Sequence, residues 1–320
     1  MRYLILIIVL LTTLNLSAQP DSIYFKEPAI DSVISPKWEN KNVAALDLSE
    51  VAFVNWNSGG SNSISALITV GGSMNYRREN LFWDNNLLMR FGINQQQDRG
   101  FSKTDDLIEI NSNFGYKKDS LSNWFFSARL NFKTQFANGF NYPDESNKIS
   151  HFMAPGYLFF GGGMEYTKNK ERFTLYFSPL TLKYTFVLDD DLANAGAFGV
   201  TGAVYDSNGV LLLAGDQIRE EVGILINSAF NTPIVKNIDM RTFVSLYTDY
   251  VNSFGNIDID WEINFDFKVN NYVRATFGSH IKYDDDVRLI ETSDIEGEVI
   301  DKGPKVQWKQ ILGVGVIYDF

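Results

Sequence analysis

One stretch of the chain alternates strictly between apolar and polar residues over thirteen positions. From Ile257 to Val269 every odd-numbered residue is apolar, and every even-numbered residue is polar or charged. Successive side chains of a β-strand point to opposite faces, so this stretch predicts a strand with one apolar face and one ionic face. It is longer than a usual soluble strand of about five or six residues, and it matches the ~9–11 tilted residues that cross a bilayer.

The same alternation recurs, less regularly, along the rest of the chain. From Trp124 to Phe132, for example, apolar residues fill every even-numbered position. The odd-numbered positions are polar apart from Phe125. About twelve such segments can be recognised, so an all-β chain is predicted. They are centred on residues 43–56, 62–77, 80–95, 103–117, 121–136, 155–167, 171–188, 216–231, 236–251, 256–269, 272–284 and 306–320.

The connections between these segments fall into short turns and long loops. Those after the even-numbered segments are short, whereas those after the third, fifth, seventh and eleventh are long, notably 137–154, 189–215 and 285–305. Short turns at one end and long loops at the other are typical of an outer-membrane barrel. We therefore predict a transmembrane, antiparallel, up-and-down β-barrel of about twelve strands over residues 43–320.

Charge is divided in the same way. The loop 189–215 carries four acidic and no basic residues, the loop 284–305 carries eight acidic and three basic residues, and the short turns are rich in lysine and arginine. The formal net charge of the whole chain is −11. A nucleic-acid binder needs a basic face, so this class is disfavoured. The chain has no cysteine, which excludes disulfides and thiolate nucleophiles.

The N-terminus has the composition of an export signal. Arg2 precedes the apolar run Leu4 to Leu16, and a small residue, Ala18, follows. A run of this length is shorter than the ~20 apolar residues of a membrane-spanning helix, so residues 1–18 are predicted to be a cleaved signal peptide. Residues 19–42, with three prolines among mixed charges, are expected to form a loose periplasmic segment.

The last segment has the pattern of a targeting strand. Trp308, Leu312, Val314 and Val316 would share one face, and the chain ends on the aromatic residue Phe320. This pattern is similar to the C-terminal strand that the barrel-assembly machinery reads. We therefore expect that machinery and outer-membrane lipid to be partners, and the cell outer membrane to be the location.

Pro179 interrupts a predicted strand of a barrel that should have no free edge. Proline cannot donate a hydrogen bond to a neighbouring strand. The apolar positions are odd-numbered before it, as at Phe177, and even-numbered after it, as at Leu182. A β-bulge at Ser178-Pro179 would shift the register by one residue and explain both observations.

Several short phrases resemble one uncharacterised family of Bacteroidota outer-membrane proteins, known as a domain of unknown function. The resemblance extends over roughly residues 43–320, and it implies a barrel in the outer membrane and no particular activity. The phrases are Asn55 to Asn62, Lys103 to Asp106, Thr134 to Phe136, Ala154 to Tyr157, Ser178 to Leu180, Gly255 to Glu262 and Tyr283 to Asp286.

Charged side chains on the polar faces of the strands would point into the barrel. If the turn after Val269 holds three residues, Glu262 lies opposite His280 and Asp260 opposite Lys282. Such residues would either line a constriction that selects polar solutes or form ion pairs that fill and close the barrel. The candidate lumen-lining residues are Asp258, Asp260, Glu262, Asp266, Arg274, His280, Lys282, Arg129, Lys133 and Arg241.

Catalytic and metal-binding interpretations are weaker. A lipase would need serine and histidine on one face, but Ser279 and His280 are adjacent and so point to opposite faces. The acidic runs 189–191 and 284–286 have ligand types that suit Ca²⁺, yet such runs are usually solvated loop tips. We expect no catalytic residue, no metal and no cofactor.

Two functions from different classes remain open. The first is a narrow, polar-lined channel for small solutes. The second is a closed barrel that acts as a structural or surface interaction protein through its long acidic loops.

Overall fold

The computed structural model describes residues 37–52, 62–97, 99–119, 122–168, 172–252, 254–292 and 299–319. The predicted signal peptide, the residues 19–36, the phrase 55–61 and the terminal Phe320 lie outside these ranges. Among the described residues, no helix combines the length and the apolar character needed to span a bilayer.

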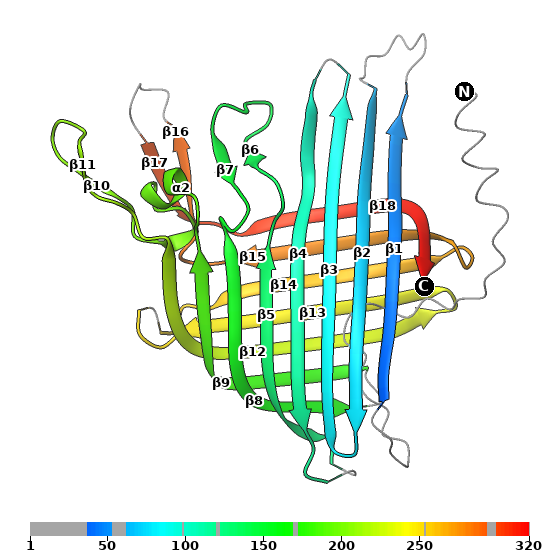
Figure 1. Ribbon diagram of the computed structural model, residues 1–320. Coiled ribbons are helices and arrows are strands. Elements are labelled where there is room, and N and C mark those ends of the chain that lie inside the picture. The colour runs from blue at the N-terminus through cyan, green and yellow to red at the C-terminus, as the bar shows by residue number, and fades with distance from the viewer. Residues whose placement is uncertain are drawn as a thin grey trace.

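Twelve antiparallel strands close into a single barrel (Figure 1). This confirms the predicted fold class and strand number. Going round the barrel, the order is β1-β18-β15-β14-β13-β12-β9-β8-β5-β4-β3-β2. The strands are β1 (Lys37–Val51), β2 (Ser63–Arg78), β3 (Leu81–Gln96), β4 (Phe101–Tyr116), β5 (Trp124–Thr134), β8 (Gly156–Lys168), β9 (Phe173–Phe186), β12 (Ile218–Val235), β13 (Ile238–Asp249), β14 (Asp258–Lys268), β15 (Val273–Tyr283) and β18 (Gln307–Asp319).

The long loops contain short elements that the alternation did not predict. Three small two-stranded sheets and a helical segment stand at the loop end of the barrel, in its upper part in Figure 1. They are β6 (Gly139–Phe140) with β7 (Lys148–Ser150), β10 (Val204–Tyr205) with β11 (Leu211–Leu213), β16 (Arg288–Thr292) with β17 (Val299–Pro304), the α-helix α2 (Asp190–Asn194) and the 3₁₀ helix η2 (Ala197–Gly199).

Two strand boundaries differ from the prediction. Strand β1 begins at Lys37 rather than at residue 43, because its polar first residues continue the ladder with β2, from Lys37 opposite Arg77 onward. The connection after β3 was predicted to be long, yet β3 ends at Gln96 and β4 begins at Phe101. Both errors have one cause. Where a strand extends beyond the part of the wall that is apolar outside, its residues are polar, and the alternation that predicts a strand is lost.

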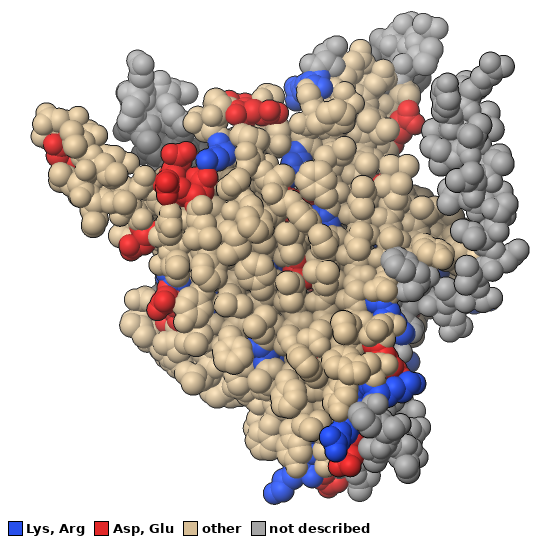
Figure 2. All heavy atoms as spheres, in the orientation of Figure 1, with Lys and Arg blue, Asp and Glu red and all other residues tan. Residues whose placement is uncertain are grey.

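The burial pattern of the wall is inverted relative to a soluble protein. On β4 the polar Asp105, Glu109 and Asn113 are buried, whereas Ile110 and Phe114 are 41% and 47% exposed. The other strands repeat this pattern, with apolar side chains pointing outward. Figure 2 shows a wall that is mostly free of charge, with acidic and basic side chains gathered towards its two ends. An outward apolar band of this kind is what a bilayer-spanning barrel requires.

Polar groups on the outer face are paired with one another. The indole Nε1 of Trp83 donates to Ser112 Oγ at 2.8 Å, and that of Trp308 donates to Ser279 Oγ at 2.9 Å. Pairing of this kind removes the cost of exposing a donor to hydrocarbon. At the turn end, Trp38 packs on Tyr76 and Trp83, with ring centroids 5.1 and 5.9 Å apart. Aromatic residues at this level are typical of a membrane-interface girdle.

The predicted bulge in β9 is confirmed. Gly162 pairs with Leu180 and Met164 with Phe177, so Ser178 and Pro179 together oppose the single residue Gly163. The Ser178 hydroxyl donates to the carbonyl of Gly162 at 3.0 Å. The bulge therefore places proline where no ladder hydrogen bond is needed and reverses the inward and outward positions of the strand.

Gly115 lies against a buried aromatic pair at the turn end of the barrel. A Cβ atom at this position would lie 2.1 Å from Phe82, whose ring packs edge-on against Phe125. We expect Gly115→Ala to lower the free energy of unfolding by about 1–3 kcal/mol through overpacking. Gly162→Ala is the matched control, because no atom lies within 4 Å of a Cβ there. Equal unfolding curves for the two variants in denaturant would contradict this account.

Candidate functional site

The barrel encloses two cavities lined mostly by polar and charged side chains. The smaller has a volume of about 120 Å³ and is lined by residues of β3, β4, β5, β8, β9, β12, β13, β14 and β15. The larger has a volume of about 650 Å³, and its lining also includes residues of β1, β2 and β18. Together they make the barrel interior the candidate functional site.

Lys183 is the centre of the ion-pair network around the smaller cavity. Its Nζ lies 2.8 Å from Asp258 Oδ2, 3.3 Å from Glu221 Oε2 and 3.9 Å from Asp284 Oδ2. The lysine side chain is only 4% exposed. One buried cation therefore holds three carboxylates from three different strands or loops. Arg219 adds a second cation, with contacts to Glu221 at 3.6 Å and to a loop aspartate.

Two further basic residues, both on β5, extend the network, and one of them reaches across the barrel. Lys133 Nζ lies 3.6 Å from both Glu109 Oε1 and Asp260 Oδ2, which links β5 to β4 and β14. Arg129 Nη2 lies 2.5 Å from Glu165 Oε2, and both side chains are largely buried. Ion pairs that link strands other than immediate neighbours narrow the interior at this level.

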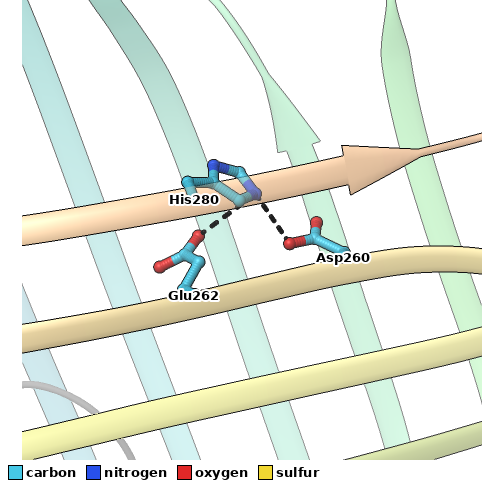
Figure 3. Close-up of side chains that lie close together, drawn as sticks. All are labelled: Asp260, Glu262 and His280. Carbon is cyan, nitrogen blue, oxygen red and sulfur yellow. Dashed lines mark hydrogen bonds and ion pairs between the residues drawn. The ribbon is translucent and has the colours of Figure 1, made fainter. Parts of the chain in front are cut away.

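His280 faces two carboxylates on the adjacent strand (Figure 3). Its Nε2 lies 2.8 Å from Asp260 Oδ1 and 3.8 Å from Glu262 Oε1. The register pairs Glu262 with His280 and Asp260 with Lys282, which confirms the predicted alignment of β14 and β15. Ser279 points the other way, because its hydroxyl accepts from Trp308 on the outer face.

An aromatic cluster occupies one side of the interior, and the alternation did not predict it. Tyr176, Leu225 and Tyr247 are buried together, with Phe159 packed against them. The guanidinium of Arg129 lies 4.3 Å from the ring centroid of Tyr176, and Lys183 Nζ lies 5.0 Å from that of Tyr247. Cations over ring faces are stabilised by the ring quadrupole. The interior wall is thus partly aromatic rather than wholly ionic.

The larger cavity contains a second set of ion pairs. Asp105 lies between Lys309 Nζ at 2.7 Å and Arg90 Nε at 3.3 Å. Arg241 pairs with Asp266, and Arg274 Nη2 lies 3.7 Å from Asp47 Oδ2. The lining of this cavity includes six basic and four acidic residues, so it carries an excess of positive charge.

Two groups of side chains have donor types that suit a metal ion. Asp260, Glu262 and His280 form one, and Asp258, Asp284 and Asp285 form the other. In each group a lysine, Lys133 or Lys183, already lies next to the carboxylates. The ion pairs account for both arrangements, and we assign no metal to either.

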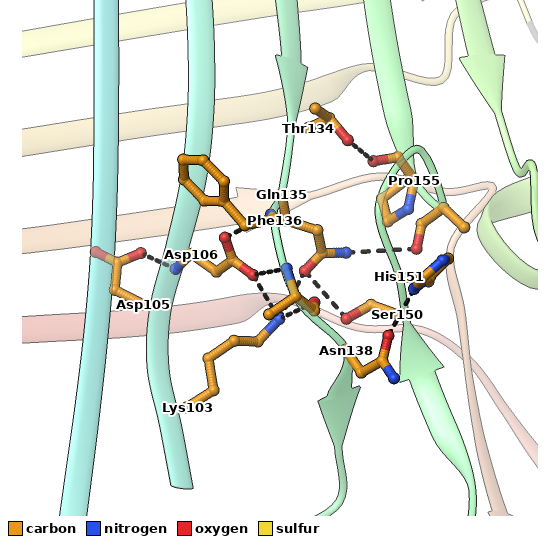
Figure 4. A network of polar contacts seen from close by, with 12 residues as sticks. Lys103, Asp105, Asp106, Thr134, Gln135, Phe136, Asn138, Ser150, His151 and Pro155 are labelled. Carbon is orange, nitrogen blue, oxygen red and sulfur yellow. Dashed lines mark hydrogen bonds and ion pairs between the residues drawn. The ribbon is translucent and has the colours of Figure 1, made fainter.

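A polar network ties the loop between β5 and β8 to the end of β4 (Figure 4). Asp106 accepts hydrogen bonds from the backbone N–H groups of Phe136 and Ala137 at 2.7 and 2.9 Å. Lys103 Nζ donates to Asp106 and to Gln135 Oε1 at 2.9 and 3.0 Å. Ser150 donates to Gln135, whereas the neighbouring His151 contacts Asn138, so these two residues have separate partners.

The phrases that carry the family resemblance meet in this network. Lys103, Gln135 and Pro155 belong to three separate phrases. Lys103 donates a hydrogen bond to Gln135. Gln135 donates one to the Ala154 carbonyl, and Thr134 donates one to the Pro155 carbonyl, so the three phrases are linked. Two other phrases meet at Lys183, which contacts Asp258 and Asp284. The phrases therefore mark two tertiary clusters, one in the loop base and one in the interior.

Asp106 is expected to hold the β5–β8 loop closed. Its side chain is 2% exposed, so Asp106→Ala leaves two N–H donors and a lysine without their acceptor. Loss of a buried charged acceptor costs about 1.5–3 kcal/mol, which corresponds to roughly 10- to 150-fold faster tryptic cleavage at Lys148 in the folded protein. The control is Asp144→Ala in the same loop, where Ser146 alone among the described residues loses a side-chain partner, so the cleavage rate should stay within about twofold.

A second contact joins this loop to the helix α2. Lys148 Nζ lies 2.6 Å from Asp189 Oδ2, and the hydrogen bond raises the pKa of Lys148. Burial opposes ionisation of Asp189, yet the bonds from Lys148 and from the Leu192 N–H outweigh it and hold the pKa of Asp189 below its usual value. A lowered carboxyl pKa favours the folded loop above about pH 4, and this contribution is lost as the pH falls through the folded-state pKa.

The predicted lumen-lining residues are distributed over both cavities. Asp258, Asp260, Glu262, Lys282, Arg129 and Lys133 line the smaller cavity. Asp266, Arg274 and Arg241 line the larger, and His280 contacts Asp260 from the next strand. A role for these residues in solute passage remains a prediction.

Other interior residues were not among those candidates. The most important are Glu165, Tyr176 and Tyr247, each at most 3% exposed. Glu165 follows three glycines and Tyr176 precedes the bulge, so the alternation around them is irregular. The spacing of Arg129 and Glu165 gives no local signal, because their contact depends on how β5 and β8 pair.

Part of the chain matches one family profile. The profile of a family described as "Protein of unknown function (DUF3078)" matches residues 48–140. No curated protein matches the chain.

Solved structures with related folds are barrels of the outer membrane and of translocators. An outer membrane channel from Pseudomonas putida F1 has 11% identity and a TM-score of 0.41, covering 94% of this chain and 100% of that one. The NanC porin has 10% identity and a TM-score of 0.36, covering 86% and 98%. The translocator domain of the autotransporter NalP from Neisseria meningitidis has 11% identity and a TM-score of 0.32, covering 91% and 90%.

Proposed function

We propose that this chain is an outer-membrane β-barrel whose interior is a narrow passage for small polar or charged solutes. The observation that carries the proposal is the pair of cavities, about 120 and 650 Å³, lined by ion-paired side chains inside a wall that is apolar outside. The short turns would face the periplasm and the long loops the exterior, as in other barrels of this architecture. Residues 1–18 would direct export, and the periplasmic segment would end where β1 begins.

The narrowest part of this passage would lie at the smaller cavity. Lys133 and Lys183 there hold carboxylates from strands that are not their neighbours, and Arg129 holds Glu165 of the neighbouring strand β8. A solute that carries charge can exchange partners with such ion pairs, whereas an apolar solute would leave them unpaired. The passage should therefore select polar and charged solutes of small size.

Insertion would use the C-terminal strand. The outward side chains of β18 are well exposed, with Trp308 at 68%, Leu312 at 74% and Val314 at 57%. An apolar outward row on the last strand supports the proposed recognition by the barrel-assembly machinery.

Single-channel recording in a planar bilayer tests the proposal. We expect small, discrete conductance steps from the folded protein, and we expect Lys133→Glu to shift the permeability ratio severalfold towards cations. Lys37→Glu is the control, because the side chain of Lys37 is 73% exposed at the turn end of β1 and its ammonium forms an ion pair only with Glu39 among the described residues. A bilayer that stays silent with folded protein, or equal shifts in both variants, would contradict a conducting interior.

The second candidate function, a surface interaction protein, is favoured by one loop. The hairpin β10–β11 projects from the loop end, and its apolar side chains are exposed, with Leu211, Leu212 and Leu213 at 47%, 65% and 64%. Exposed apolar clusters of this kind mark interaction sites. If this function holds, the folded barrel should give no conductance steps, and replacing the three leucines by serine should abolish co-purification of an outer-membrane partner.

A further inference from the structure

The junction between the first and last strands of the barrel is shorter than the others. Within the described part of the chain, strands β1 and β18 pair over only six residues, from Val43 opposite Asp319 to Leu48 opposite Val314, whereas every other neighbouring pair of strands extends over at least nine. The next residues of β1, Ser49 to Val51, keep their partners on β2 but have none among the described residues of β18. In Figure 1, β1 runs up the view and β18 runs across it, so the strands diverge beyond the paired part.

The larger cavity reaches this gap in the wall. Its lining includes Leu48 and Ser49 of β1 on one side and Ile311 to Gly313 of β18 on the other. Leu312 points outward and is 74% exposed. A cavity lined both by buried residues such as Leu88 and by an outward residue opens through the wall.

We infer that this gap, here called the lateral entrance, admits an anionic lipid of the surrounding membrane to the larger cavity. The inference rests on the proposed placement in a membrane. Open backbone groups cannot face hydrocarbon without cost, so a gap in a spanning wall needs a polar group within it. A lipid provides an acyl chain for the outside and a polar headgroup for the inside.

The chemistry on the two sides of the entrance fits such a molecule. Outside, Leu48, Trp308 and Leu312 form an apolar rim, each more than half exposed. Inside, the cavity has an excess of basic residues. Arg274 Nε and Thr276 Oγ1 are buried there and make no hydrogen bond within the described part of the chain. Unused donors beside a positive charge suit a phosphate group.

Lys309 and Asp105 lie directly behind the entrance. Their ion pair, 2.7 Å long, connects β18 to β4 across the cavity. The anionic headgroup would share Lys309 and Arg90 with Asp105, because both cations contact that carboxylate. Two positive charges then balance two negative ones, so lipid entry leaves no charge in this group uncompensated.

Bridging the entrance tests the inference, and the absence of native cysteine makes this simple. In the variant Ser49→Cys/Gly313→Cys, a short bismaleimide would join the strands where pairing has ended. The control variant, Ala45→Cys/Ile317→Cys, receives the same reagent where the strands are already paired. Both are placed in vesicles containing phosphatidylglycerol that carries one photoreactive group on the glycerol headgroup and another on the acyl chain, and labelled residues are identified by mass spectrometry.

We expect the headgroup probe to label the interior Leu67 and Leu88 before bridging, and this labelling to fall at least fivefold after bridging in the test variant only. Labelling of the outward Phe114 by the acyl-chain probe is the reference and should not change. If Phe114 is labelled and Leu88 is not, or if bridging has no effect, the lateral entrance is wrong while the membrane placement stands. If Phe114 is not labelled, the membrane placement itself fails.

The preference for an anionic headgroup is tested in the same vesicles. Photoreactive phosphatidylcholine should label Leu88 at least threefold less than phosphatidylglycerol, and Arg274→Gln should remove most of this difference. Equal labelling by the two lipids would overturn the proposed headgroup class.

Discussion

Replacing Ile110 by arginine is expected to lower the free energy of unfolding in lipid vesicles by about 2–4 kcal/mol. Ile110 lies in the middle of β4, points outward and is 41% exposed. In a bilayer this position faces hydrocarbon, where a guanidinium loses its hydration. In a water-soluble barrel the same substitution on an exposed position would be nearly neutral. Urea titration followed by tryptophan fluorescence measures the difference.

The control for this prediction is Phe101→Arg. Phe101 begins the same strand at the loop end and is 59% exposed, so it is more accessible than Ile110. Near the membrane interface the cost of arginine falls to about 0–1 kcal/mol. Equal effects at the two positions, or a gain in solubility without detergent for Ile110→Arg, would show that the outer wall does not contact lipid.

Replacing Lys183 by methionine is expected to cost about 3–5 kcal/mol of stability. The substitution keeps the length of the side chain but removes the charge that Asp258, Glu221 and Asp284 share. Glu221 is 2% exposed in its side chain, so water replaces little of the lost interaction. Breaking a buried ion pair leaves uncompensated charge, and three carboxylates would then repel one another.

Lys268→Met provides the comparison for Lys183. Lys268 likewise forms an ion pair, with Asp239 at 2.7 Å, but these two side chains are 40% and 34% exposed. An exposed pair is worth about 0–1 kcal/mol. In the background of Lys183→Met, Asp258→Asn should restore part of the stability by removing one of the repelling charges. If Lys183→Met and Lys268→Met unfold at the same denaturant concentration, the interior network does not stabilise the barrel.

Much of the fold could be predicted from local patterns. The alternation from Ile257 to Val269 predicted β14 and, with the length of the turn, the pairing of Glu262 with His280. The phase change at Pro179 predicted the bulge in β9. These features depend on residues that are near in sequence, because one residue of shift exchanges the inner and outer faces of a strand.

Less of the candidate site could be predicted. Arg129 was expected inside, but its partner Glu165 and the ring of Tyr176 were not. The contacts of Lys183 join residues that lie 38 to 101 positions apart, which no local spacing encodes. Similarly, nothing in the phrase Lys103 to Asp106 indicates that it binds the backbone of Phe136.

Alternation along each strand determined by itself which side chains face in and which face out, since the two faces differ by a single residue step. Only the tertiary structure decided which inward groups meet across the barrel, and how far β1 and β18 pair before they diverge. The reason is geometric. Cross-barrel distances depend on the tilt and offset at which twelve strands close, and these belong to the whole ring rather than to any one strand.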